Sequence, residues 1–112
     1  MFPRGRRLRR RRDIYLVLRG SRPINVLGLT LRTRYTTNSF PRSTVVVGSA
    51  VSKRATVRNR IKRQLRHQLA VELKSLRRGV DLMLIVRTPL LKQTSAERLA
   101  TLRTVLRRAR LF

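Results

Sequence analysis

Nine residues in the middle of the chain, 58–66, carry its strongest chemical signal. They read Arg-Asn-Arg-Ile-Lys-Arg-Gln-Leu-Arg and include five cations. If the segment is helical, Arg58, Lys62 and Arg66 share one face, because residues four apart are neighbours on a helix. Its two aliphatic residues are also four apart and point elsewhere, into a core. A helix of this kind is suited to lie against a polyanionic backbone.

The charge of the chain indicates the same kind of partner. It has 112 residues and a formal net charge of +25, and only four of its 29 basic residues are lysines. Arginine favours planar, bidentate contact with phosphate and stacking on bases, whereas lysine acts mainly as a point charge. Repulsion on this scale disfavours a compact free monomer, and a nucleic acid would neutralise many charges at once. We therefore expect a nucleic-acid partner.

Several other classes of protein are excluded by the composition. No apolar stretch approaches the roughly 20 residues needed to cross a bilayer. There is no cysteine to form a disulfide or a thiolate metal site, and 41% of the residues are apolar, which argues against a wholly disordered basic tail. The length predicts one domain with one modest core. An arginine-rich start is also typical of mitochondrial presequences, but the expected location is the cytoplasm.

An arginine run occupies residues 4–12. Such a run is typical of a segment that is extended or disordered without a partner. It is expected to contact phosphates and cannot read a base sequence by itself, and it is also typical of a nuclear or nucleolar address. The residues expected to make non-specific phosphate contacts are Arg6, Arg7, Arg9, Arg10, Arg11 and Arg12.

The acidic residues decide whether the chain could cut a phosphodiester by itself. Asp13, Glu72, Asp81 and Glu97 are its only acidic side chains, and no two are close in sequence. Two of them, Asp13 and Glu97, stand at expected helix starts. Two-metal hydrolysis requires several carboxylates around a pair of ions, and His67, the only histidine, has no evident orienting partner. We therefore expect neither a catalytic residue nor a metal-ligand set in the protein alone.

The elements that must position the basic segment follow from hydrophobic periodicity. Alternating apolar residues predict a strand over 25–33, and a β-branched run predicts another over 44–51, with a loop at 34–42 between them. An almost wholly apolar run over Val80–Val86 predicts a strand buried on both faces. A further short strand has room near Ile24.

Three helices are expected around these strands. Asp13 begins a short first helix that Gly20 ends. Apolar residues at helical spacing predict a long helix over 57–76, of about five turns. Thr94 and Glu97 form a capping box before the last helix. The order is α-β-β-α-β-α, to which the short strand would add a third β before the long helix.

These features resemble the bacterial ribonuclease P protein family. Residues 58–63 are similar to its Arg-Asn-Arg signature, and residues 7–13 to its basic leader followed by an aspartate. Residues 44–51 resemble its Val-rich strand, residues 81–87 the next strand, and residues 102–112 the last helix with its terminal aromatic. The resemblance covers nearly the whole chain.

The resemblance implies a fold and a function. The fold is an α/β (α+β) two-layer sandwich of order α-β-β-β-α-β-α with a left-handed β-α-β crossover, an exception to the usual right-handed rule. It implies a basic leader at 1–12 and a domain at 13–112. The protein would be a subunit of an endoribonuclease that removes the 5′ leader of precursor tRNA, while the catalytic RNA subunit holds most of the Mg²⁺. Its implied partners are that RNA and precursor tRNA, with no membrane and no obligate protein partner.

The resemblance also assigns roles to residues. It places the single-stranded leader in a cleft between the sheet and the 58–66 helix. The residues implied to contact the RNA subunit, and to help organise metal binding near the cleavage site, are Arg58, Asn59, Arg60, Lys62, Arg63 and Arg66. Those implied to contact the leader are Ile14, Leu18, Thr30, Ser49, Lys53, Arg54 and Phe112.

The chain departs from the family pattern at the residues implied to contact the tRNA leader. Family members have aromatic side chains on the first helix and first long strand, at positions where this chain has Ile14, Leu18 and Thr30, so base stacking worth about 1–3 kcal/mol each is largely absent. Phe112, Tyr15 and Tyr35 are the aromatic residues that would replace part of it. The family's Ser-Lys-Lys triplet aligns with residues 48–50 without a gap, and with residues 52–54 if three residues are deleted. The ungapped register is favoured.

Two other readings share the size and charge of this chain. One is a structural ribosomal RNA-binding protein, and the other is a DNA-compacting protein. Stronger binding of 5′-extended tRNA than of mature tRNA would separate a ribonuclease P subunit from both.

Overall fold

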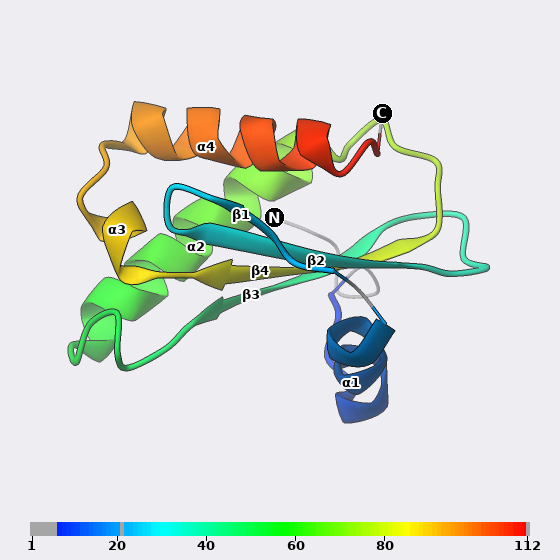
Figure 1. Ribbon diagram of the computed structural model, residues 1–112, viewed down its shortest axis with the longest axis horizontal. Coiled ribbons are helices and arrows are strands. Elements are labelled where there is room, and N and C mark those ends of the chain that lie inside the picture. The colour runs from blue at the N-terminus through cyan, green and yellow to red at the C-terminus, as the bar shows by residue number, and fades with distance from the viewer. Residues whose placement is uncertain (1–6, 21, 112) are drawn as a thin grey trace.

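The computed structural model describes residues 7–20 and 22–111, and these fold around one four-stranded sheet. The strands are β1 (Ile24–Val26), β2 (Leu29–Tyr35), β3 (Arg42–Val47) and β4 (Val80–Val86), in the spatial order β1-β2-β4-β3. The helices are α1 (Arg11–Gly20), α2 (Ala55–Glu72), α3 (Thr88–Leu91) and α4 (Ser95–Arg108). The shared core places α2 and α4 on one face of the sheet, and Figure 1 shows α4 above the sheet and α1 under the opposite face.

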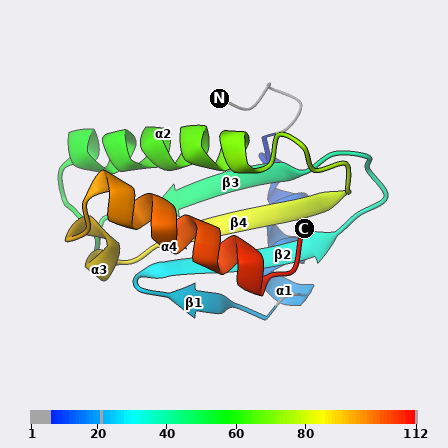
Figure 2. The same cartoon turned by 90° about the horizontal axis from the view of Figure 1, so that it is seen from above.

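The connection from β3 through α2 to β4 is a left-handed crossover. The two strands are parallel neighbours, whereas β2 pairs antiparallel with both β1 and β4. Figure 2 views the sheet from the side that α2 and α4 cover, and both β3 and β4 point to the left in it. If the picture is rotated so that the two strands point upward, β4 lies to the left of β3. The predicted α+β class and this unusual handedness are therefore confirmed, and the predicted element order is confirmed apart from the additional short helix α3.

The main core fills the space between the sheet and the two long helices. Strand β4 places Leu82, Leu84 and Val86 on this face, and Leu82 and Leu84 are fully buried. Helix α2 adds Ile61, Leu65 and Leu69, while α4 adds Leu102, Val105 and Leu106. Tight packing on this scale leaves α2 and α4 little freedom to move over the sheet.

The strand predicted over 25–33 is instead two strands joined by a tight turn. Leu27 and Gly28 both have positive φ angles, 45° and 89°, which is the backbone of a type I′ hairpin turn. A Cβ on Gly28 would stand 2.5 Å from the backbone nitrogen of Leu90, so a side chain is also excluded by the close approach of α3. The uninterrupted apolar alternation across this glycine concealed the turn.

Other element boundaries differ from the sequence prediction. Helix α1 begins at Arg11 rather than Asp13 and has 10 residues, so Asp13 lies in its first turn and is not its N-cap. Strand β3 covers Arg42–Val47, and the predicted end of that strand is a turn. Helix α2 ends at Glu72, although Leu73 and Leu76 beyond it remain buried.

The C-terminal third combines a missed element with a confirmed one. The four-residue helix α3, with Pro89 in its first turn, was not predicted. The capping box is confirmed, because Thr94 accepts the Glu97 N–H and the Glu97 carboxylate accepts the Thr94 N–H. This backbone hydrogen bond to Thr94 lowers the pKa of Glu97 below its usual value.

Residues 7–12 do not form a detached tail. The Leu8 N–H donates to the Ser43 carbonyl at 2.8 Å, and the Leu8 side chain is only 2% exposed. Arg11 and Arg12 form the first turn of α1. The boundary between a basic N-terminal segment (1–12) and the domain (13–112) stays a prediction. Arg6 lies outside the described residues.

Candidate nucleic-acid interface

Helix α2 is held rigidly by its apolar face, which fixes the orientation of its cations. Ile61, Leu65 and Leu69 are at most 4% exposed. The prediction that the aliphatic residues of the 58–66 segment point into a core is therefore confirmed. Because residues opposite this stripe must face outward, the basic side chains of the segment present their charges at the surface.

The first cation of the segment also has a structural partner. Arg58 is half-buried, and its Nη1 donates to the Ser52 carbonyl at 2.8 Å. This bond fastens the start of α2 to the connection that follows β3. The N-cap of the helix, Arg54, makes no side-chain capping bond, so its side chain satisfies none of the free N–H groups in the first turn.

The remaining residues of the predicted RNA contact set point outward without partners. Asn59, Arg60 and Arg63 are exposed, and Lys62 and Arg66 are half-buried. Within residues 7–20 and 22–111, none of these five makes a hydrogen bond or ion pair with another side chain or with a backbone group outside the helix. No acidic residue lies in the first turn of α2 to offset the charge at that end of the helix.

The four acidic side chains all have partners elsewhere. Arg42 binds both oxygens of Asp81, at 2.9 and 2.8 Å, and reaches Asp13 at 3.4 Å. The hydrogen bond to Asp81 raises the pKa of Arg42, so this guanidinium stays charged. Because Asp13 lies on α1 while Arg42 and Asp81 lie on neighbouring strands, this cluster fastens α1 to the sheet.

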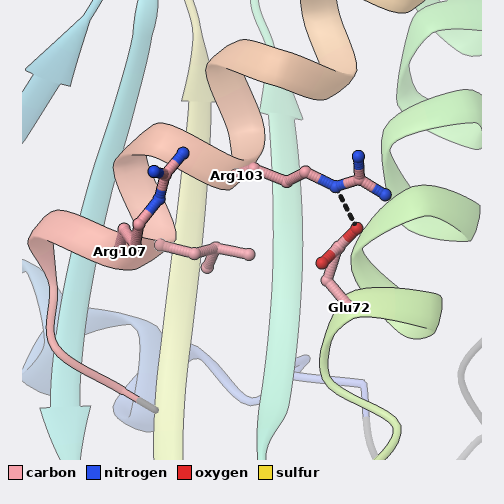
Figure 3. A pocket seen from close by; sticks show the side chains of 4 residues that line it. Glu72, Arg103 and Arg107 are labelled. Atoms are coloured by element: carbon pink, nitrogen blue, oxygen red, sulfur yellow. Dashed lines mark hydrogen bonds and ion pairs between the residues drawn. The ribbon is translucent and has the colours of Figure 1, made fainter.

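A second ion pair joins the two long helices. Figure 3 shows Arg103 of α4 reaching across to Glu72 of α2, with Nε and Oε1 2.7 Å apart. Arg107, on the next turn of α4, points its guanidinium away from this pair. With Glu97 in its capping box, each carboxylate has a structural role.

The described residues offer no arrangement suited to hold a metal ion. No group of three or more histidine, cysteine, aspartate or glutamate side chains comes together in them. The carboxylates of Asp81 and Glu97 already accept hydrogen bonds from Arg42 and Thr94. The expectation that Mg²⁺ is held mainly by an RNA subunit stays a prediction.

The structure contradicts a cleft between the sheet and α2. The face of the sheet beneath α2 is filled by the main core, where Val45 and Leu84 are at most 2% exposed. The leader residues Ile14 and Leu18 lie on α1, under the opposite face (Figure 1). An extended nucleic-acid strand therefore has no room beside α2 and the sheet.

The predicted leader residues instead border the α1 face of the sheet. Thr30 pairs with Ile85, which pairs with Val46, so the three form one row across β2, β4 and β3. Ile85 and Val46 pack against the small cluster that contains Val17 of α1, which places the row on the α1 face. Figure 1 shows α1 under one end of the sheet and the β3–α2 connection at the other end.

The individual leader candidates differ in accessibility. Leu18 is 41% exposed, whereas Thr30 is 3% exposed and its hydroxyl donates to Asn25. Lys53 is exposed, and Ser49 lies in a turn that follows β3. Arg54 is exposed as well, and Phe112 lies outside the described residues. The choice between the 48–50 and 52–54 registers stays open, because both lie in the same connection.

Sequence reasoning missed Val46 and Ile85 as surface residues on the α1 face. Both are half-buried, whereas the other six residues of β4 are buried, as the apolar run Val80–Val86 predicted. The signal that could have found them is strand periodicity, since alternate residues of β3 and β4 must face away from α2. Arg32 was also missed; its Nη1 donates to the Leu18 carbonyl at 3.1 Å and holds the end of α1.

The fold and the uncompensated cations of α2 define a small nucleic-acid-binding α/β domain. In the described part of the chain, no helix is both long and apolar enough to span a bilayer. A family model described as Ribonuclease P matches residues 2–110. The chain therefore belongs to the Ribonuclease P family.

Individual relatives agree with this assignment. The chain is 37% identical to a ribonuclease P protein component from Cyanothece sp., over 78% of this chain and 79% of the relative. It is 33% identical to another from Pseudanabaena sp., covering 100% of this chain and 97% of the relative. The solved structure of a Staphylococcus aureus RNase P protein mutant matches with a TM-score of 0.88 over 96% of this chain and 91% of that chain; at 21% identity this match speaks for the fold alone.

Proposed function

We propose that this protein is the protein subunit of ribonuclease P, and that the outer face of α2 binds the catalytic RNA. The observation that carries the proposal is the set of cations on α2 that have no carboxylate partner. A surface helix normally interleaves acidic and basic residues, and α2 has no acidic residue before Glu72. Guanidinium groups left uncompensated on a rigid helix are well suited to phosphate oxygens.

The opposite face of the sheet is the proposed site for the 5′ leader of precursor tRNA. A strand lying from Leu18 past Val46 and Ile85 would meet half-buried apolar surface, with Lys53 and Arg54 near the far end for its phosphates. The catalytic RNA and the leader would then contact opposite faces of one domain. In this arrangement the protein assists endonucleolytic removal of the leader, while the RNA subunit holds Mg²⁺ and carries the chemistry in the cytoplasm.

The direct test is cleavage of a 5′-extended precursor tRNA by the cognate ribonuclease P RNA at low Mg²⁺, with and without this protein. The wild-type protein should restore correct 5′ cleavage. A double variant, Arg60→Ala with Arg63→Ala, should lose most of that effect, because both side chains are exposed and have no structural role. Arg107→Ala with Arg108→Ala removes the same charge from α4 and is the matched control, expected to retain cleavage.

Salt dependence and tRNA selectivity complete the test. Six to ten phosphate contacts would weaken RNA binding by roughly 10³–10⁵-fold between 50 and 200 mM salt. The protein should also bind 5′-extended tRNA more tightly than mature tRNA. Tight RNA binding without restored cleavage would instead support a structural ribosomal protein, and a preference for duplex DNA would support a DNA-compacting protein.

A further inference from the structure

A pocket between α2, α3 and α4 has the chemical features of a nucleotide site. Its volume is about 470 Å³, within the usual size range of small-ligand sites. Val57, Ile61 and Leu91 supply apolar wall, while Gln64, Ser95, Arg60 and Arg98 supply polar groups. A shallower hollow shares Arg60 and Gln64 with this pocket and continues along α2 to Arg63 and His67.

The polar groups of the pocket are held in fixed positions. The side-chain oxygen of Gln64 accepts a hydrogen bond from Arg98, and its nitrogen donates to the Ser95 hydroxyl at 2.7 Å. These two bonds orient the amide and leave its second N–H without a partner in the described part of the chain. An amide fixed in this way can donate to the edge of a base.

Arg98 brings a charge that the fold does not neutralise. None of the ion pairs among residues 7–20 and 22–111 includes Arg98. Its Nε is buried and has no hydrogen-bond partner there. Its neighbour Glu97 is held in the capping box by Thr94 and so does not serve as a counter-ion. Arg98 is half-buried, and a guanidinium in this setting without a carboxylate partner is suited to bind an anion such as a phosphate.

We propose that this pocket receives one unpaired nucleotide of the RNA that binds α2, with its base against the apolar wall and its phosphate near Arg98 and Arg60. The proposal rests on the function proposed above and adds a specific contact to it. An unstacked base is required, because a base within a helix presents neither its face nor its pairing edge to a concave pocket. The amide of Gln64 would make the site selective for a base edge, which the outward cations of α2 are not.

The test uses two variants that change the pocket and one that does not. Gln64→Glu keeps an oxygen that accepts from Arg98, and its second oxygen can accept from the Ser95 hydroxyl, which rotates to donate, so both contacts between α2 and α4 are retained. The variant removes the amide donor and places a negative charge beside the phosphate. Arg98→Met removes the guanidinium and keeps the apolar stem. Arg107→Met is the matched control: it lowers the net charge by the same amount as either variant, from an exposed position on α4 outside this pocket.

The readouts are affinity for the cognate ribonuclease P RNA and chemical reactivity of its unpaired bases in the complex. Loss of a base contact should weaken binding by roughly tenfold in Gln64→Glu and Arg98→Met. At least one base protected by the wild-type protein should become reactive in both. Arg107→Met should cost at most about two- to threefold, as expected when one positive charge is lost outside the proposed RNA-binding surface, and keep the protection.

The experiment distinguishes failure of the proposed nucleotide site from failure of the proposed ribonuclease P function. If the wild-type protein binds the RNA and restores cleavage, while the pocket variants match Arg107→Met in affinity and base protection, the nucleotide site is overturned and the proposed function stands. If the wild-type protein neither binds this RNA nor restores cleavage, both are overturned.

Discussion

The two faces of the sheet are built by different means. Under α2 and α4 the face is a continuous apolar core in which Leu82 and Leu84 have no exposed surface. On the other face the buried apolar residues that cluster together, among those the structure describes, are Leu8, Val17 and Met83. There the position of α1 depends largely on Arg42, with its bonds to two aspartates.

This difference gives the two faces different roles in the proposed function: one face stabilises the fold, and the other is a proposed binding surface. The face under α2 and α4 is fully covered, so it holds the cation-bearing helix rigid and offers no surface of its own. The α1 face leaves Val46 and Ile85 half-buried and is bordered by basic residues, which suits it to a ligand that is itself flexible and charged. The proposed site for the catalytic RNA therefore lies on a helix above the core, and the proposed site for the leader lies on the open side of the sheet.

The largest effect should come from breaking the ion-pair cluster on the α1 face. Arg42→Met leaves Asp81, whose side chain is 0% exposed, with an unpaired buried charge. This should lower the free energy of unfolding by about 3–5 kcal/mol. Urea unfolding at high salt measures it, and Arg42→Met combined with Asp81→Asn should recover much of the loss because no charge remains buried. A loss below about 1 kcal/mol, typical of exposed pairs, would mean that apolar contacts alone hold this face.

Two neighbouring residues of β4 compare the faces directly. Leu84→Ala empties a fully buried site under the helices and should cost about 3 kcal/mol, whereas Ile85→Ala on the half-covered face should cost about 1 kcal/mol. Denaturant unfolding of the two variants under identical conditions gives both values. Equal losses would contradict the view that only one face carries a tightly packed core.

An aromatic residue introduced on the α1 face would test that face as the proposed binding surface for the 5′ leader. Leu18 is 41% exposed at the edge of this face. Leu18→Phe should raise the preference for 5′-extended over mature tRNA by about fivefold, equivalent to a weak base stack of about 1 kcal/mol. Competition binding measures the preference, with Val71→Phe on α2, which replaces a residue 59% exposed, as control. An equal gain in the control would attribute the effect to hydrophobicity alone.

The smallest expected effect concerns the capping box of α4, on the face of the sheet that α2 and α4 cover. Because the folded-state pKa of Glu97 is lowered, its carboxylate stabilises the fold above the ordinary glutamate pKa of about 4.3. That contribution is lost as the pH falls through the lower, folded-state pKa. The difference in unfolding free energy between wild type and Glu97→Gln should therefore be present near neutral pH and vanish in acid. A difference that does not change with pH would mean that the cap does not depend on charge.

Local patterns account for the parts of the structure that sequence analysis predicted correctly. The aliphatic spacing of α2, the capping box at Thr94 and the apolar run of β4 each depend on residues close together in the chain. The hairpin turn at Leu27 and Gly28 was missed because alternation continues across it. The α3 turn was missed because its conformation depends on packing against that hairpin, where the backbone N–H of Arg87 donates to the Gly28 carbonyl at 2.7 Å.

The sequence by itself indicated a nucleic-acid partner and the helix proposed to bind it, because net charge and helical periodicity are properties of composition and spacing. It also carried the family resemblance through residues 58–63. Only the tertiary structure decided which face of the sheet is open, since burial of β4 depends on which helices the chain lays over each side. It likewise brought Gln64, Ser95 and Arg98 together from two helices, which no spacing in the sequence predicts.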